Sequence, residues 1–171
     1  MKLNRKQKIL IILSVAIVAF VIIADLISKH FTTGFADAQS IIPHLINFKS
    51  SKNTGAAWGI FSGSTTALII VSFVAVALII VYAIWSKKQS YLFSISISLI
   101  ISGAIGNLVD RLIFGYVRDF IQFDFWKTFP IFNIADCALT IGIFCLIIYY
   151  FIEIIKELKE KFQLLMHNLQ Y

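Results

Sequence analysis

Charged side chains are scarce in this sequence of 171 residues: Asp, Glu, Lys and Arg together make up 14% of the chain. A typical soluble domain carries roughly 25% of these residues. The hydrophobic share is 59%, and the mean hydropathy is +0.87. A water-soluble core of this size cannot bury so much apolar surface, so the sequence excludes an ordinary soluble domain and makes lipid the solvent for much of the chain.

Residues that form disulfides or bind metals are also few. The two cysteines, Cys137 and Cys145, are eight positions apart in one apolar segment. On a helix they are roughly 12 Å apart, too far for a disulfide, and we expect both to be small buried residues. The three histidines, His30, His44 and His167, show no ligand spacing. The sequence therefore predicts neither a metal site nor a cofactor.

The charges that are present have an excess of one sign. Lys and Arg number 15 against 9 Asp and Glu, which gives a formal net charge of +6. Such a charge can indicate nucleic-acid binding, but these basic residues lie in short tracts beside apolar runs, a placement typical of membrane orientation signals. We expect no nucleic acid partner.

Long apolar runs dominate the rest of the sequence. Residues 9–24 follow a basic N-terminal tract, as in a signal peptide. The run is long and no cleavage site of small residues follows it closely, which favours an uncleaved first transmembrane helix. Four spans are predicted, over residues 9–29, 65–85, 92–111 and 134–155. Because the chain contains neither an internal repeat nor a linker, we expect one domain over residues 1–171.

The distribution of Lys and Arg predicts the orientation of these spans. Both termini and the loop at 86–91 share one side with nine basic residues, whereas the loops at 31–64 and 114–133 carry four. We therefore expect cytoplasmic termini and two outward-facing loops. The 31–64 loop is apolar enough to fold onto the membrane surface, with 41–48 as a candidate strand, and the tail at 156–171 is expected to be an exposed or membrane-surface helix.

Polar residues gather where the predicted spans end on the outward side. Asp25 and Lys29 end the first span with the spacing of a helical ion pair. Two interpretations of this pair remain open: an interfacial anchor whose lysine extends to the headgroups, or a polar support for a site. The third span ends with Asn107, Asp110 and Arg111 on one helical face. We expect Arg111 to neutralise a carboxylate and the set to brace a site rather than to perform chemistry.

Two aspartates flank the second outward loop. If residues 116–126 are extended, Asp119 is the lone charge on an apolar face, whereas an irregular segment would leave it facing water. Asp136 opens the fourth span, where Asn133 is a natural N-cap and an early acid suits the helix dipole. Two carboxylates that share a site cannot both ionise, so one can polarise a carbonyl while the other takes a proton from water. We therefore predict that Asp119 and Asp136 are a catalytic pair of the aspartic-protease type.

Five blocks of residues, in this order, resemble the lipoprotein signal peptidases of bacteria. They are Asp25-x-x-Ser28-Lys29, Asn53-x-Gly55-x-Ala57-Trp58-Gly59, Gly106-Asn107-x-x-Asp110-Arg111, Val117-Arg118-Asp119-Phe120 and Phe132-Asn133-x-Ala135-Asp136. Each block is short, but five in order with four spans between them are highly specific. The resemblance implies an all-α membrane protein of four transmembrane helices with a small extracellular β-sheet.

The resemblance also implies an activity and a location. It implies an aspartic endopeptidase of the bacterial cytoplasmic membrane, with Asp119 and Asp136 as the dyad near the outer face and with no cofactor. The implied substrate is a prolipoprotein that carries diacylglyceryl on its lipobox cysteine and is cleaved just before that cysteine, and the implied inhibitor is the cyclic peptide globomycin. We expect a monomer surrounded by membrane lipid. Residues that bind substrate or support the dyad are implied to be Asn53, Gly55, Asn107, Asp110, Arg111, Asn133, Ala135, Asp25 and Lys29.

Other classes of function fit the sequence less well. Proton-coupled transporters also place acids in apolar surroundings, but usually near the bilayer midplane and with repeats or broken helices. A peptidase that uses Ser28 and Lys29 is disfavoured because adjacent helical residues point about 100° apart. Cleavage of a diacylglyceryl-modified but not of an unmodified lipobox peptide would establish the predicted substrate class.

Overall fold

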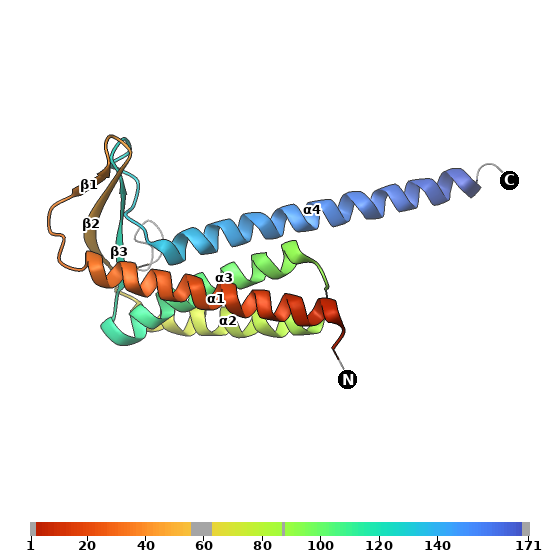
Figure 1. Cartoon of the computed structure of the whole chain (residues 1–171), viewed down its shortest axis with the longest axis horizontal. Coiled ribbons are helices and arrows are strands. Elements are labelled where there is room, and N and C mark those ends of the chain that lie inside the picture. The colour runs from red at the N-terminus through yellow and green to blue at the C-terminus, as the bar shows by residue number, and fades with distance from the viewer. Residues whose placement is uncertain (1–2, 56–62, 87, 169–171) are drawn as a thin grey trace.

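Four long helices and one small sheet form the computed structural model, which describes residues 3–55, 63–86 and 88–168 (Figure 1). The elements, in chain order, are α1 (Arg5–Thr32), β1 (Gln39–Ile42), β2 (Ile46–Asn53), α2 (Thr65–Ser86), α3 (Tyr91–Phe114), β3 (Val117–Phe123) and α4 (Ile134–Asn168). All four helices are long and apolar enough to cross a membrane. The expected fold class is therefore confirmed. The residues Ala57, Trp58 and Gly59 of the second block lie outside the described residues.

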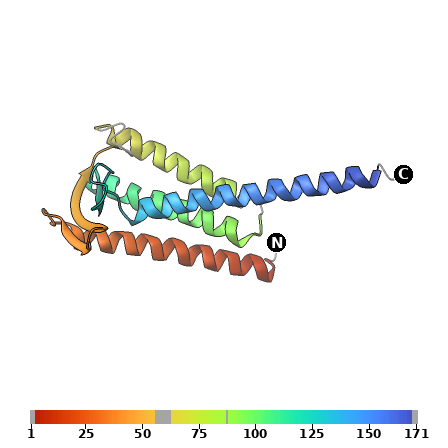
Figure 2. The same ribbon diagram turned by 90° about the horizontal axis from the view of Figure 1, so that it is seen from above.

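Helix α3 is the centre of the bundle. It packs against α1, α2 and α4. Figure 2 shows α1 and α2 on the two sides of the bundle with α3 and α4 between them. The side chains of Ser96, Ser98 and Ser102 on α3 are buried, and each hydroxyl donates to a backbone carbonyl of the preceding turn. Small residues whose polar groups are satisfied in this way allow close helix packing in lipid.

The sheet lies across the end of the bundle that is remote from both chain termini (Figure 1). It is antiparallel, in the order β1-β2-β3. Ser51 on β2 lies opposite Asp119 on β3, and Asn53 lies opposite Val117. This register brings Asn53, at the end of β2, close to Asp119.

A left-handed glycine turns the chain from α3 into β3. The N–H of Gly115 donates to the carbonyl of Arg111 at 3.1 Å, and Gly115 has a φ of 78°. This is the conformation that glycine adopts most easily at the end of a helix. Because no earlier residue stops the helix, α3 extends to Phe114, three residues beyond the predicted end of the third span.

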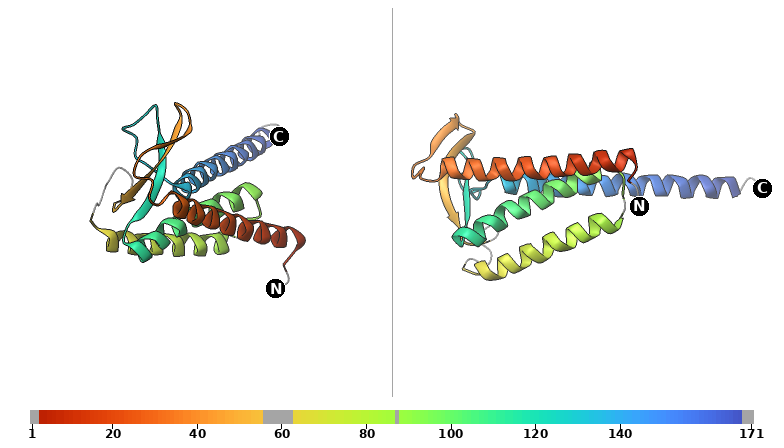
Figure 3. Two further views of the ribbon diagram at one scale, coloured as in Figure 1. Left: turned by 60° about the vertical axis from the view of Figure 1, so that its left-hand side comes forward. Right: turned by 60° about the horizontal axis from the view of Figure 1, so that its bottom comes forward.

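One further difference from the prediction concerns the outward loop, whereas the prediction of an exposed helix over the tail is confirmed for residues 156–168. The 31–64 loop contains two strands instead of a candidate strand at 41–48, because Pro43 and the left-handed His44, with a φ of 61°, form a turn between β1 and β2. The tail is continuous with α4, which has 35 residues. The length of α4, about 52 Å, exceeds the thickness of a bilayer core, which is roughly 30 Å. Figure 3 shows that α4 projects beyond the other helices.

Candidate active site

The polar site lies where β3 meets the start of α4. The N–H of Phe132 donates to the carbonyl of Ile121 at 3.0 Å. The carbonyl of Phe132 accepts from the N–H groups of Phe120 and Ile121 at 2.9 and 2.8 Å. Because Phe132 directly precedes the first turn of α4, these bonds fix the N-terminus of that helix beside β3.

Asn133 and Asp136 form a reciprocal cap on α4. Asn133 Oδ1 accepts from the N–H of Asp136 at 2.8 Å, and Asp136 Oδ2 accepts from the N–H of Asn133 at 3.1 Å. This is the arrangement of a capping box, so Asn133 is the N-cap that the sequence predicts. The cap uses only one oxygen of Asp136. The other, Oδ1, accepts from Asn107 Nδ2 at 2.7 Å.

Asp119 is almost completely buried on β3, with 2% of its surface exposed. Its two oxygens accept from Asn133 Nδ2 at 2.6 Å and from Asn53 Nδ2 at 3.0 Å. Burial, and then the neighbouring charge of Asp136, raise the pKa of the Asp119 carboxyl from 3.8 to about 7, although the two amide hydrogen bonds oppose the shift. The extended segment with a buried Asp119 is therefore confirmed, and the alternative in which this side chain faces water is wrong.

One amide on α3 connects these acids to a buried lysine. Asn107 Oδ1 accepts from Asn133 Nδ2 at 3.0 Å and from Lys29 Nζ at 3.2 Å. Asn107 Nδ2 is the group that donates to Asp136. The side chains of Asn107 and Asn133 therefore join Asp119, Asp136 and Lys29 in one hydrogen-bond network.

A buried ion network supports these amides. Lys29 Nζ lies 2.7 Å from Asp25 Oδ2 and 3.3 Å from Asp110 Oδ2. All three side chains are fully buried. The predicted Asp25–Lys29 ion pair is therefore confirmed, and the interpretation in which Lys29 extends to the headgroups is wrong.

Arg118, rather than Arg111, neutralises Asp110. Arg118 Nη2 lies 2.7 Å from Asp110 Oδ1, and the backbone N–H of Arg118 donates to Asp110 Oδ2 at 2.9 Å. Arg111 Nη2 instead donates to the carbonyl of Gly55 at 2.9 Å, and the N–H of Gly55 donates to Asn53 Oδ1 at 3.0 Å. The expectation that Arg111 pairs with a carboxylate is wrong, because the turn after α3 brings the second arginine back onto Asp110.

Close packing holds the start of α4 against α1 and α3. Ala135 is fully buried, and its N–H donates to Asp25 Oδ1 at 2.9 Å. A side-chain carbon on Gly106 would lie 2.8 Å from Asp25 Oδ2 and 3.0 Å from the Cβ of Ala135. The three elements can therefore approach this closely only because residue 106 is glycine.

A cavity of about 890 Å³ opens onto this network. Both Asp119 and Asp136 line it, together with Asn53, Asn107 and Arg111. The remaining wall is mostly apolar and is formed by residues on β3, on the segment before α4 and on the first turns of α4: Phe123, Phe129, Pro130, Ile131, Phe132, Leu139 and Ile141. The lining of the cavity therefore combines carboxyl and amide groups with hydrocarbon.

This apolar wall and the role of Arg118 were not predicted from the sequence. Pro130 and the phenylalanines at 123, 129 and 132 are visible in the sequence as an aromatic cluster within the second outward loop. Their rings pack together in the structure, with Phe123 and Phe132 centroids 5.2 Å apart. The residue that could have predicted the pairing of Arg118 with Asp110 is Gly115, because a glycine at the end of a helix indicates that the chain reverses before β3.

The chemistry available to this site is that of carboxyl groups. Within residues 3–55, 63–86 and 88–168 there is no cluster of three or more His, Cys, Asp or Glu side chains that could hold a metal ion. Asp119 can retain a proton near neutral pH because of its raised pKa. Two carboxyl groups on one cavity wall, one of them able to carry a proton, can perform general acid–base chemistry.

Comparison with known proteins identifies the family. Residues 17–152 match the family described as signal peptidase (SPase) II. The lipoprotein signal peptidases of Staphylococcus aureus strains JH9 and Newman are each 40% identical to this chain over 139 residues, which cover 79% of this chain and 85% of theirs.

Two solved structures of bacterial membrane enzymes, obtained by the in meso method at 2.3 Å and 1.9 Å resolution, are similar in fold. The first has a TM-score of 0.76 and 37% identity over 81% of this chain and 87% of that one. The second has a TM-score of 0.73 and 38% identity over 80% and 91%. This chain therefore belongs to the signal peptidase II family, the multi-pass membrane proteases that remove signal peptides from prolipoproteins.

Proposed function

We propose that this protein is an aspartic endopeptidase that forms one membrane domain over residues 1–171 and uses Asp119 and Asp136 as its catalytic dyad. The observation that carries the proposal is that both carboxyl groups line one cavity and belong to one hydrogen-bond network through Asn107 and Asn133. The raised pKa of Asp119 allows the pair to hold one proton at neutral pH.

The reaction needs only this pair and a water molecule. The ionised carboxylate takes a proton from the water, whose oxygen attacks the scissile carbonyl carbon, while the protonated carboxyl gives its proton to the carbonyl oxygen. The resulting gem-diol collapses when the leaving nitrogen accepts a proton from the first carboxyl and the C–N bond breaks. A hydroxyl proton of the gem-diol returns to the second carboxylate, so the pair ends as it began.

The other residues of the site are proposed to position this pair. Asn53, Asn107 and Asn133 donate to the two carboxyl groups and limit their rotation. The buried ions Asp25, Lys29 and Asp110 and the packed Ala135 hold those amides. Arg111 lines the cavity and is held by the carbonyl of Gly55, so this pair is proposed to orient the substrate.

The substrate is proposed to be a prolipoprotein with diacylglyceryl on its lipobox cysteine, cleaved just before that cysteine. The apolar wall formed around Phe123, Phe129 and Leu139 supplies hydrocarbon beside the acids, as a lipidated residue next to the scissile bond requires. Globomycin, a cyclic peptide, is proposed to compete for the same cavity. A lipid-facing bundle allows the substrate to enter from the membrane, and a monomer suffices for this chemistry.

The distribution of basic residues supports an orientation in which both termini are cytoplasmic and the sheet and dyad lie at the outer face. In this orientation the site meets the signal-peptide cleavage region of an exported lipoprotein at the outer surface of the bacterial cytoplasmic membrane.

Purified Asp119→Asn and Asp136→Asn variants test the dyad. We expect each to cleave a diacylglyceryl-modified lipobox peptide about 10²- to 10⁴-fold more slowly than the unchanged protein, because each removes one proton-transfer group. Asp37→Asn is the matched control, since Asp37 is an exposed acid next to the sheet. Thermal unfolding in detergent checks that every variant is folded.

Turnover by either dyad variant at the rate of the control would contradict the proposed mechanism. Equal cleavage of the same peptide without diacylglyceryl would contradict the proposed substrate while leaving the dyad intact.

A further inference from the structure

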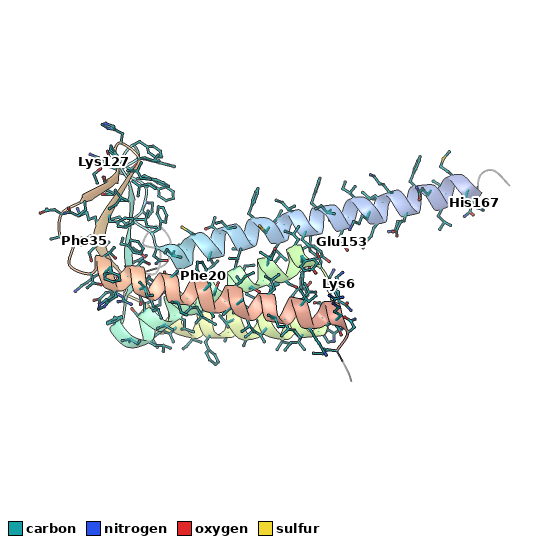
Figure 4. The ribbon with its side chains drawn as sticks, in the orientation of Figure 1. Lys6, Phe20, Phe35, Lys127, Glu153 and His167 are labelled. Carbon is teal, nitrogen blue, oxygen red and sulfur yellow. The ribbon has the colours of Figure 1, made fainter. Side chains whose placement is uncertain are left out.

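A second cavity, of about 580 Å³, lies at the opposite end of the bundle from the sheet. It is formed by the first turn of α1, the segment that leads into α3, and the middle of α4. Figure 4 shows Lys6 and Glu153 at this end of the bundle. None of its lining residues belongs to the proposed catalytic site, so the cavity requires a separate explanation.

The lining of this cavity carries an excess of positive charge from three different segments. Lys6, Lys88 and Lys156 line it together with a single acid, Glu153. That acid is already paired with Lys156 at 3.0 Å. Its charge also interacts with that of Lys88, but three lysines against one acid leave an excess of positive charge in the cavity, which an anion would stabilise.

Lys88 is held in place by aromatic rings. Its ammonium group lies 5.2 Å from the ring centroids of both Tyr149 and Tyr150. The hydroxyl of Tyr150 is hydrogen-bonded in turn to that of Tyr82 on α2, and Tyr149 packs on Phe93, 5.3 Å away. Lys88 is half-buried against this cluster and its charge is fixed at the cavity wall.

The start of α3 adds backbone donors to the same cavity. Ser90, the N-cap, forms no side-chain hydrogen bond to the first turn, and Ser90, Tyr91 and Leu92 all line the cavity. The first N–H groups of a helix and the positive end of its dipole favour an anion. These donors supplement the lysines, which themselves supply the net charge.

The surroundings indicate the depth of the cavity in the membrane. Trp85 and Tyr91, on either side of the connection between α2 and α3, are 80% and 49% exposed, as is typical of aromatic residues at a membrane–water interface. On α1 and α4, exposed apolar side chains such as Ile12 and Phe151 lie next to the cavity on the side that faces the sheet. The cavity therefore lies at headgroup level, with hydrocarbon-facing surface beside it.

We propose that this cavity binds the phosphate headgroup of an anionic phospholipid such as phosphatidylglycerol. Lys6 and Lys88 would contact the phosphate oxygens, the α3 amides would donate to them, and the acyl chains would lie along the exposed apolar surface of α1 and α4. Basic pockets between transmembrane helices at the membrane surface have this chemistry. A free phosphate ion would satisfy the lysines but would make no use of the adjacent apolar surface.

Lipid retention by the purified full-length protein tests the proposal. Native mass spectrometry after incubation with phosphatidylglycerol, or with phosphatidylcholine of the same acyl chains, counts the bound lipids. We expect Lys6→Gln and Lys88→Gln each to weaken phosphatidylglycerol binding about fivefold. The matched control is Lys161→Gln, which removes the same charge from an exposed position on α4 outside the cavity. Lys6 is exposed, so its substitution leaves the fold intact even if Lys88→Gln disturbs the tyrosine cluster.

Each alternative outcome overturns the assignment. Equal binding of both lipids, or equal loss in Lys6→Gln and Lys161→Gln, would show that the cavity does not select the headgroup. Displacement of the bound lipid by inorganic phosphate at the same concentration as lipid would identify a free-anion site instead. Cleavage of lipobox peptide in detergent is expected to be unchanged in Lys6→Gln, which separates this proposal from the proposed peptidase mechanism.

Discussion

Asp119 receives its hydrogen bonds from neutral amides. Asn53 and Asn133 donate to its oxygens, whereas Lys29 and Arg118 are paired with Asp25 and Asp110 and Arg111 donates to the carbonyl of Gly55. Two amide donors offset only part of the cost of burying a charge, and the carboxyl keeps its proton to about pH 7.

This shift predicts the pH dependence of proteolysis. Because the pKa is raised, the protonated carboxyl predominates below about pH 7 and is lost above it. We expect the cleavage rate to fall about tenfold per pH unit on the alkaline side. The rate of cleavage of a lipobox peptide, measured from about pH 5.5 to about pH 9, tests this decrease. A rate that stays constant over this range would contradict a dyad that shares one proton.

The same shift affects stability in a defined direction. Between pH 3.8 and about pH 7, the Asp119 carboxyl keeps its proton in the folded chain but has lost it in the unfolded chain. The contribution of this carboxyl to the free energy of unfolding therefore decreases across that interval and stays low above it.

Lys29 is the cation on which the buried ion network depends. Lys29→Met would leave the carboxylates of Asp25 and Asp110 with less compensation in a site with no exposure to water. We expect a loss of about 3–5 kcal/mol in the free energy of unfolding. Titration from mild detergent into SDS measures that loss.

Lys127→Met is the control for this prediction. Lys127 is 76% exposed and lies 3.9 Å from Asp124, so its removal should change the free energy of unfolding by about 0.5 kcal/mol or less. Equal effects of the two substitutions would show that the network around Lys29 contributes nothing particular to stability.

The sequence predicted the acids of the site better than their partners. Asp25 and Lys29 lie one helical turn apart, so their pairing follows from helix geometry. The pairing of Asp110 with Arg118 crosses the turn at Gly115, and the face of a single helix cannot reveal it. Arg111, which shares that helix, was expected to neutralise a carboxylate, but it donates to the carbonyl of Gly55.

At the level of elements, Gly106 is the point where α1, α3 and α4 meet. Gly106→Ala would place a methyl group 2.8 Å from Asp25 Oδ2 and 3.0 Å from the Cβ of Ala135. We expect a loss of about 1–3 kcal/mol in stability and a clear loss of proteolysis, because α1 or α4 must shift to make room. SDS titration and the peptide assay measure the two effects.

The control on the same helix is Ile113→Ala. Ile113 is 66% exposed on the lipid side of α3, so its truncation should cost about 0.5 kcal/mol or less and preserve activity. If Gly106→Ala matched this control, the contact between α3 and its neighbours would not require glycine.

The helices were predictable because each is a long apolar run, but the strands differ in how visible they are. β3 alternates in sequence and pairs as the extended interpretation requires. β1 has four exposed residues and no alternation, so nothing in its sequence distinguishes it from a loop. The bridge between Phe132 and Ile121 consists of backbone hydrogen bonds, which leave no pattern of side chains.

For the whole molecule, the proposed orientation can be tested in intact cells. A cysteine at Lys127, which is labelled beside the sheet in Figure 4, should react with a membrane-impermeant maleimide from outside. A cysteine at Lys161, on the exposed part of α4, should react only after lysis. The parent chain, whose Cys137 and Cys145 are half-buried, supplies the background. Labelling of Lys161→Cys in intact cells would contradict the proposed orientation and indicate the opposite one.

The bond between Asp25 and the N–H of Ala135 joins positions 110 residues apart. During synthesis the first helix therefore enters the membrane long before Ala135, whose N–H donates to Asp25, has been translated. An unfinished chain carries an incompletely satisfied carboxylate in a low-dielectric setting, and arrival of the last helix removes that penalty. The bond therefore forms only after the start of the fourth helix has been made, and a chain truncated before residue 134 would hold Asp25 through Lys29 without the amide of Ala135.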